Sequence, residues 1–221
     1  MKIYDFTMVF EPEMKALWPG HPKPKVEIFT TFEKEKYEAR YISMDTHVGT
    51  HIDAPKHIVP GRKGTDEILI EQLVGEGVIL DFPRGPYEEI THEDFQKAKP
   101  AIKDRDIVLI NTGWGQRWTE PWDEAFFKSR PGITTKAAEW LVSKKVKAVG
   151  IDNLTISSGK AEELAPGTPS VHRILCSNEV IIVEGLVNLK SAVGKRLIIA
   201  VGVIPVKGSD GGQARVFAIQ V

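Results

Sequence analysis

The sequence predicts an α/β fold in which strands outnumber helices. Three observations predict this class: short apolar runs bounded by turn or charged residues recur along the chain, few segments have helical periodicity, and one helical segment leads directly into an apolar run. We therefore expect a β-rich mixed sheet or distorted barrel, with the helices packed on its outside.

The N-terminal region is predicted to contain two neighbouring strands. Residues 26–31 and 37–44 are rich in β-branched and aromatic side chains, and the charged run at 33–36 lies between them. A run of charges of this kind is typical of a solvated turn. We expect two strands joined by an exposed connection.

The rest of the chain is predicted to supply further strands and two helices. Apolar runs with the pattern of buried strands occupy residues 77–81, 107–110, 146–151, 180–183, 197–206 and 214–221. Thr91 and Asp94 form a capping-box pattern that opens a short helix, which has to stop near Pro100. A second helix follows Thr134 and Thr135 and leads into the strand at 146–151.

Composition restricts the class of protein. Of the 221 residues, 42% are hydrophobic and 27% are charged, as in ordinary globular proteins. No repeat or linker divides the chain, so we expect one domain over residues 1–221. The 29 basic and 30 acidic residues give a net charge of −1. This balance produces no positive field, so nucleic acid and anionic membranes are not expected as partners.

The first residues argue for a cytoplasmic protein. The start of the sequence has charges at Lys2, Asp5 and Glu11 and no continuous apolar core. Such a segment resembles neither a secretory signal nor a membrane span. Cytoplasmic localisation is therefore the expectation.

The segment HVGTHIDAPKH, from His47 to His57, carries the strongest chemical signal. It places three of the six histidines of the chain, His47, His51 and His57, close to the carboxylate of Asp53. Imidazole nitrogen and carboxylate oxygen suit zinc and its neighbours in the first transition row, and a catalytic site uses about three protein ligands with one position open. The segment predicts a divalent metal site, with zinc as the first choice and manganese as the alternative.

Regular secondary structure cannot bring these side chains together. An extended strand would spread His47 and His57 over roughly 33 Å at about 3.3 Å per residue. A straight helix would turn Asp53 about 200° away from His51, since each residue advances about 100°. Gly49 and Pro55 allow irregular backbone. We therefore expect a bent, loop-like site beside strands.

Two other interpretations of the histidines are weaker. The first is a polar surface without metal, which would suit a lone histidine better than four potential ligands. The second is the helical HxxxH of zincin proteases, but Val48 stands where that motif requires glutamate, and Gly49 follows.

The same segment resembles the HxGTHxDxPxH signature of the metal-dependent cyclase family, whose members include bacterial kynurenine formamidases and isatin hydrolases. Every fixed position matches. The likeness covers nearly the whole chain through Trp18-Pro-Gly, Asn111-Thr-Gly-Trp114, Gly150-Ile-Asp152, His172, the segment 184–189 and the segment 211–215. The resemblance implies a swivelling β/β/α domain that assembles as a homodimer or a larger homo-oligomer.

The resemblance also implies a role for each matching residue. His47, His51 and Asp53 correspond to ligands of one metal, with Asp53 able to bridge to a second. His172 corresponds to a ligand of the second metal, and Glu184 to a ligand that touches both, so two ions per chain are expected. The position of His57 is that of the group that donates and accepts protons.

Two features depart from the family pattern. Kynurenine formamidases usually carry an acidic residue after Trp-Pro-Gly, where this chain has His21, and the segment 157–170 is more broken by proline and glycine than the helix expected there. Both concern the identity of the substrate more than the metal chemistry.

The expected reaction is hydrolysis of a small amide. Metal-bound hydroxide would attack the carbonyl and His57 would protonate the departing nitrogen. An arylformamidase that converts N-formylkynurenine to kynurenine and formate is the first expectation, with Trp18 as a wall of the pocket and Trp114 and Trp118 as weaker candidates. A cyclic amide hydrolase with one metal and a non-catalytic metal-binding protein are the alternatives.

Overall fold

The computed structural model describes residues 1–12, 14, 20–117, 124–160 and 170–220. The strands in this part of the chain are β1 (Lys2–Asp5), β2 (Lys25–Thr30), β3 (Ala39–Ser43), β4 (His51–Asp53), β5 (Val74–Asp81), β6 (Glu89–Ile90), β7 (Ile107–Asn111), β8 (Gly132–Ile133), β9 (Ala148–Ile151), β10 (Ile181–Glu184), β11 (Arg196–Val203) and β12 (Gly211–Gln220). The α-helices are α1 (Phe32–Glu35), α2 (Ile70–Leu73), α3 (His92–Lys97), α4 (Glu124–Ser129), α5 (Thr135–Ser143) and α6 (Val171–Ser177).

The main sheet closes on itself. Its strand order is β1-β12-β11-β5-β7-β9-β10-β4, and β4 also pairs with β12, so the strands from β12 to β4 form a barrel-like ring with β1 added at its side. The pairs β5–β7, β7–β9 and β9–β10 are parallel, and the other pairs of this sheet are antiparallel. The sheet is therefore mixed, as expected.

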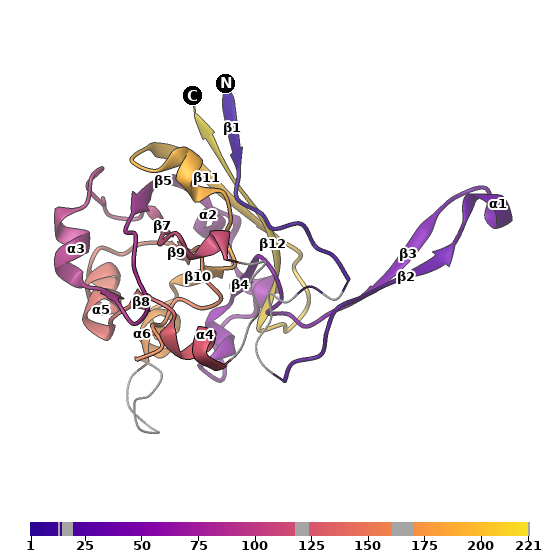
Figure 1. Ribbon diagram of the computed structural model, residues 1–221, viewed down its shortest axis with the longest axis horizontal. Coiled ribbons are helices and arrows are strands. Elements are labelled where there is room, and N and C mark those ends of the chain that lie inside the picture. Colours follow the sequence, from indigo (N-terminus) through magenta and orange to yellow (C-terminus); the bar gives the residue numbers. More distant parts are fainter. Residues whose placement is uncertain (13, 15–19, 118–123, 161–169, 221) are drawn as a thin grey trace.

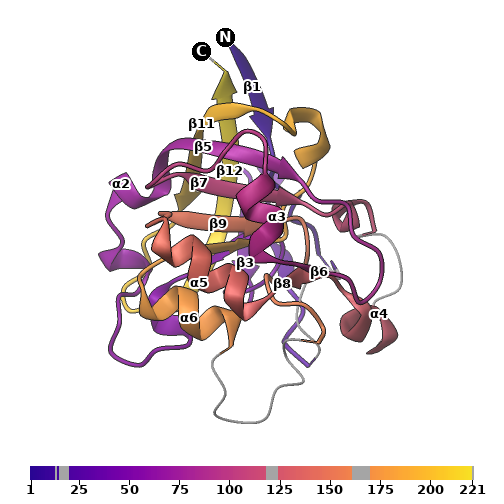
Figure 2. The same ribbon diagram turned by 90° about the vertical axis from the view of Figure 1, so that its left-hand side faces the viewer.

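Both faces of the central strands are buried. One face packs against α3, α5 and α6, which lie together on the outside of the ring (Figures 1 and 2). Val78, Val108 and Val149 belong to the cluster beneath these helices, whereas Ile79, Leu109 and Ala148 belong to the second cluster, together with side chains of β11 and β12. This two-sided burial explains why β7 is apolar along most of its length.

The strand pair predicted near the N-terminus stands apart from the barrel. β2 and β3 form a separate antiparallel sheet that projects far from the body, with α1 at its tip (Figure 1). The charged run at 33–36 is not a plain turn, because its first residues belong to the single helical turn α1. We refer to residues 25–43 as the arm.

The other sequence-based elements agree with the structure. The capping-box pattern opens α3, where the Thr91 amide donates to Asp94 Oδ2 over 2.8 Å. Thr134 caps α5, and β9 follows that helix. Each predicted apolar run overlaps a strand of the main sheet, and the runs at 146–151, 180–183 and 197–206 extend beyond theirs by one to three residues. Residue 221 lies outside the described part. None of the helices in the described ranges is long and apolar enough to cross a membrane.

Candidate metal centre

The segment from His47 to His57 bends twice, at the two residues expected to allow it. Gly49 has a φ of 66°, within the turn that precedes β4. Pro55 begins a short 3-10 turn, Pro55–His57, that follows β4. The expectation of a loop-like site was wrong for the middle of the segment: residues 51–53 form a strand, because hydrogen-bonding partners are available on both sides, from β10 and β12.

Strand geometry brings three candidate ligands together. His51 and Asp53 are two residues apart on β4, so their side chains leave the same face. Glu184, the last residue of β10, lies opposite His51 in the antiparallel register. All three side chains are almost fully buried, and their ligand atoms lie within 4.8 Å of one another. The sheet itself thus builds this half of the site.

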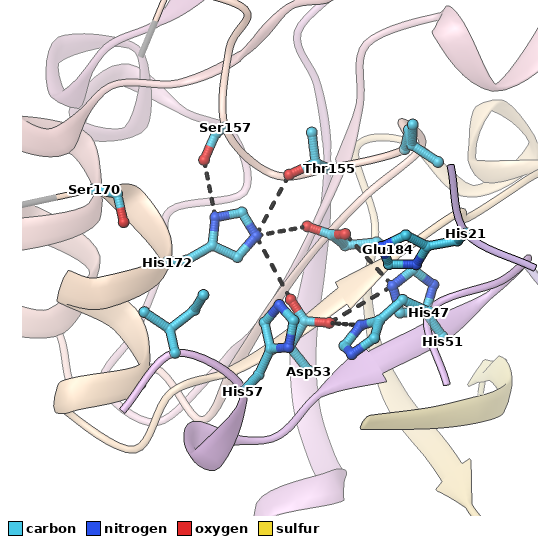
Figure 3. A pocket seen from close by; sticks show the side chains of 12 residues that line it. His21, His47, His51, Asp53, His57, Thr155, Ser157, Ser170, His172 and Glu184 are labelled. Atoms are coloured by element: carbon cyan, nitrogen blue, oxygen red, sulfur yellow. Dashed lines mark hydrogen bonds and ion pairs between the residues drawn. The ribbon is translucent and has the colours of Figure 1, made fainter. Parts of the chain in front are cut away.

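His172 reaches the same point from α6. Ser170 caps that helix by accepting a hydrogen bond from the Arg173 amide, and the His172 ring projects toward Asp53 and Glu184 (Figure 3). Its Nε2 lies 3.2 Å from Glu184 Oε1 and 3.6 Å from Asp53 Oδ2. A side chain distant in sequence therefore joins the group, as the resemblance implied.

Each of the two buried carboxylates, Asp53 and Glu184, has one oxygen that faces His51 and another that faces His172. Asp53 Oδ1 lies 2.8 Å from His47 Nδ1 and 3.6 Å from His51 Nε2, while its Oδ2 faces His172. Glu184 Oε2 lies 3.5 Å from His51 Nε2, while its Oε1 faces His172. This arrangement suits carboxylates that bridge two neighbouring ions.

In each candidate histidine ligand, the ring nitrogen that points away from Asp53 and Glu184 contacts a further polar group. His51 Nδ1 lies 2.9 Å from the Gly49 carbonyl oxygen, His172 Nδ1 lies 3.0 Å from Ser157 Oγ, and His47 Nε2 lies 2.9 Å from Asp210 Oδ2. Histidines that bind metals usually donate their other N–H to such acceptors, which fix the tautomer and the orientation of the ring. The partners agree with a ligand role for all three rings.

His51 provides the test of whether a metal fits. The Gly49 carbonyl can only accept, so Nδ1 of His51 carries the hydrogen, and in the neutral ring Nε2 is a lone-pair atom. Within the described residues, this buried Nε2 has no hydrogen-bond partner. It points toward two carboxylates, so a cation, either a proton or a metal ion, has to lie between them. The nitrogen and oxygen donors suit a divalent transition metal.

The site concentrates negative charge. Burial alone would raise the pKa of Glu184, but the neighbouring His172 and His51 hold it below the ordinary value. Burial would lower the pKa of His47, but its hydrogen bonds to Asp53 and Asp210 raise it to about 10. The glutamate therefore remains ionised at neutral pH, and a divalent cation has to compete with protons for this site.

The centre opens into a cavity of about 330 Å³. His57 lies at its wall, half-buried, and His21, Ile58, Leu154 and Ser170 add further lining. His57 also comes close enough to His47 and Asp53 for the three ligand atoms to lie within 4.8 Å of one another. The volume falls at the lower end of pockets for small molecules, which measure about 300–1,000 Å³.

Asp210 and three tryptophans remain to be compared with the sequence-based expectations. Asp210, whose Oδ2 contacts both His47 and His57, was not predicted. Its only signal is its place next to the resemblance at 211–215. Trp114 does not line this cavity: it is buried and donates from its ring nitrogen to the Arg84 carbonyl. Trp18 and Trp118 lie outside the described residues.

Comparison with known proteins gives consistent results. The model of the family described as "Putative cyclase" matches residues 4–158. A kynurenine formamidase of Erythrobacter litoralis is 27% identical, over 95% of this chain and 89% of its own. An isatin hydrolase of Roseibium aggregatum is 25% identical, over 99% of this chain and 92% of its own.

Among solved structures, one described as a "potential metal-dependent hydrolase with cyclase activity" is 30% identical and has a TM-score of 0.77. The match covers 98% of this chain and 96% of that one. These relatives support a metal-dependent hydrolase. Since the family model matches more than half of its residues, the chain belongs to the cyclase family.

Proposed function

We propose that this protein is a metal-dependent hydrolase of small amides, and specifically an arylformamidase that converts N-formylkynurenine to kynurenine and formate. The observation that carries the proposal is Nε2 of His51, which finds no hydrogen-bond partner in the described part of the chain and faces Asp53 and Glu184 beneath a small-molecule cavity. The kynurenine formamidase among the relatives supports the choice of substrate.

The residues of the centre fall into two groups, those that would hold metal ions and one, His57, that would transfer protons. His47, His51 and Asp53 would hold one ion, His172 a second, and Asp53 with Glu184 would span both. Divalent metal ions of this kind polarise a carbonyl and lower the pKa of water, which supplies the nucleophile and stabilises the developing oxyanion.

His57 is suited to proton transfer at the departing nitrogen. It lines the cavity, and an imidazole can both donate and accept a proton through its ring nitrogens. A general acid at this position would turn a poor amine leaving group into a good one.

The test is hydrolysis by the purified protein, loaded separately with zinc and with manganese. The panel contains N-formylkynurenine, simple formanilides and cyclic amides such as isatin. We expect turnover of the formanilides, its loss on chelation and its recovery on metal addition. Full activity in chelator with no metal by elemental analysis would refute the metal-dependent reaction.

The same panel decides between the alternatives. Opening of isatin in preference to formanilides would favour a cyclic amide hydrolase, which the similarity to an isatin hydrolase supports. The chain would then be expected to work with one metal. Tight metal binding without hydrolysis of any amide would favour a non-catalytic metal-binding protein.

The arm supports a further proposal, that the protein is a homo-oligomer, with a dimer as the simplest form. Its exposed apolar side chains are Ile28, Phe29, Phe32, Tyr37, Tyr41 and Ile42. An isolated two-stranded sheet is marginally stable in water, so we expect another protein surface to pack against the arm. A second copy is favoured because the arm carries equal numbers of opposite charges, Lys25, Lys34, Lys36 and Arg40 against Glu27, Glu33, Glu35 and Glu38.

The oligomeric state can be tested without assaying the enzyme. We expect light scattering after size-exclusion chromatography to give at least twice the mass of one chain. Replacing Phe29 and Tyr41 by Ser should shift the protein toward the monomer, whereas replacing the exposed Val9, outside the arm, should not. A monomeric unmodified protein would contradict this assembly.

A further inference from the structure

Asp210 is a carboxylate that the closure of the barrel brings to the site. It immediately precedes β12, whose first residue, Gly211, pairs with Asp53. The Asp210 carbonyl oxygen also accepts a hydrogen bond from the Ala54 amide over 2.9 Å. The backbone of Asp210 is therefore tied to the segment that carries His51, Asp53 and His57.

The side chain of Asp210 joins two imidazoles through one oxygen. Oδ2 lies 2.9 Å from His47 Nε2 and 3.1 Å from His57 Nδ1. The other oxygen, Oδ1, accepts from the Thr46 hydroxyl over 3.2 Å. The two rings are 4.1 Å apart between centroids and tilted by 41°. A carboxylate held by Thr46 thus sets the orientation of both rings at once.

The contact with His57 has a chemical consequence because of the nitrogen involved. A carboxylate that faces Nδ1 favours the tautomer with hydrogen on that nitrogen and leaves Nε2 as the nitrogen that exchanges a proton with a ligand. His57 sits on a three-residue turn and lines the cavity. Without a partner, the ring on such a short turn could rotate and present either nitrogen.

We propose that Asp210 is a positioning residue, which holds Nδ1–H of His57 so that Nε2 is directed to the substrate, and which couples this orientation to that of His47. The inference rests on the proposed function, in which His57 transfers a proton. It adds a role for a residue that neither holds the metal nor touches the substrate. Asp210 would be needed for turnover even when the metal site is full.

Asp210→Ala and Ser157→Ala form the matched pair that tests this role. Ser157 contacts Nδ1 of His172, as Asp210 contacts Nε2 of His47, so each variant removes the support of one candidate ligand. Both should bind zinc more weakly, by about 10- to 100-fold. At saturating zinc, Ser157→Ala should keep more of its kcat than Asp210→Ala, because its contact is with His172. Asp210→Ala should remain about 10- to 100-fold low in kcat, with KM changed by less than about twofold.

Asp210→Asn and a spectroscopic measurement complete the design. The amide of Asn offers one accepting oxygen instead of two, so its kcat should fall between those of the unmodified protein and Asp210→Ala. Nitrogen-15 NMR of the zinc-loaded protein should show His57 mainly as the Nδ1–H tautomer, assigned by the loss of its signals in His57→Ala. That preference should disappear in Asp210→Ala.

Each contrary result has a defined meaning. An unchanged kcat in Asp210→Ala, or an equal deficit in Ser157→Ala at saturating zinc, would overturn the proposal. So would a His57 tautomer that is insensitive to Asp210→Ala. If the unmodified protein hydrolyses no amide, the proposed function fails, and the NMR comparison alone then decides whether Asp210 positions His57.

Discussion

Glu184 and His51 face each other across the antiparallel pair of β10 and β4, with Oε2 3.5 Å from Nε2. The register of the two strands therefore places a carboxylate and an imidazole that are far apart in sequence next to each other. Since strand pairing sets this distance, the two side chains are fixed more firmly than groups on loops would be.

The first prediction separates metal binding from chemistry. His57→Ala should keep its metal but lose about 10² to 10⁴ in turnover, the usual effect of removing a general acid-base. His51→Ala should lose both metal and activity, because His51 faces the two buried carboxylates. Metal content and kcat are measured on the same samples. Release of metal from His57→Ala as readily as from His51→Ala would make His57 a ligand.

The second prediction concerns the number of ions. His172 faces one oxygen of Asp53 and one of Glu184, while His47 and His51 face the other side of Asp53. His172→Ala should therefore lower the metal content from about two ions per chain toward one. Elemental analysis after dialysis measures this ratio. Saturation of the unmodified protein at one ion, with unchanged affinity in the variant, would indicate a mononuclear site.

The third prediction tests the space beside His47. A Cβ at Gly211 would lie 2.7 Å from His47 Cε1 and 2.7 Å from the Ile52 carbonyl oxygen, so Gly211→Ala should displace the ring or the backbone. We expect metal affinity to fall by at least about 10-fold. Gly202→Ala is the control, because its Cβ would meet only the Arg215 carbonyl oxygen at 3.6 Å. Equal affinities of the two variants would argue against a role for His47 in metal binding.

The fourth prediction concerns stability against pH. Burial alone would raise the pKa of Asp94, but its hydrogen bond from the Thr91 amide and its ion pair with Arg84 lower it. The folded-state pKa thus lies below that of the unfolded chain, about 3.9. The stabilisation is complete above that value and disappears as the pH falls through the folded-state pKa.

Asp94→Ala should accordingly cost about 1 kcal/mol in the free energy of unfolding at pH 7, and less near pH 3. Denaturant unfolding at both pH values measures the difference from the unmodified protein. Metal release at low pH affects both proteins and cancels in this comparison. Glu139→Ala, at an exposed position of α5, should change little at either pH. A penalty for Asp94→Ala that is the same at both pH values would contradict the assignment.

Much of the fold could be predicted from local patterns in the sequence. Apolar runs located β5, β7, β9, β10, β11 and β12, and capping residues located α3 and α5, because each signal is carried by consecutive residues. β4 was missed because three residues have no periodicity, and they are a strand only through pairing with β10 and β12. The helical turn α1 was missed because its charges are equally typical of a turn.

The same distinction applies to the site. The spacing of His47, His51 and Asp53 predicted a metal site, and Gly49 and Pro55 predicted its bends. His172 and Glu184 were found only through a family resemblance, since one is a helix residue and the other the end of an apolar strand. Asp210 was found neither from residue spacing nor from the resemblance. Its contact with His57 arises from the pairing of β12 with β4 and leaves no pattern in the sequence around it.

The pairing of β4 with both β10 and β12 has a consequence for the order of events during synthesis. The ribosome produces His47, His51 and Asp53 early, long before Glu184 and Asp210. A nascent chain that ends before β10 has neither neighbour of β4, so these histidines remain on an unpaired segment. Such long-range pairing also predicts slow folding. The finished centre therefore forms late, and metal loading is expected to follow release of the chain rather than to guide its early folding.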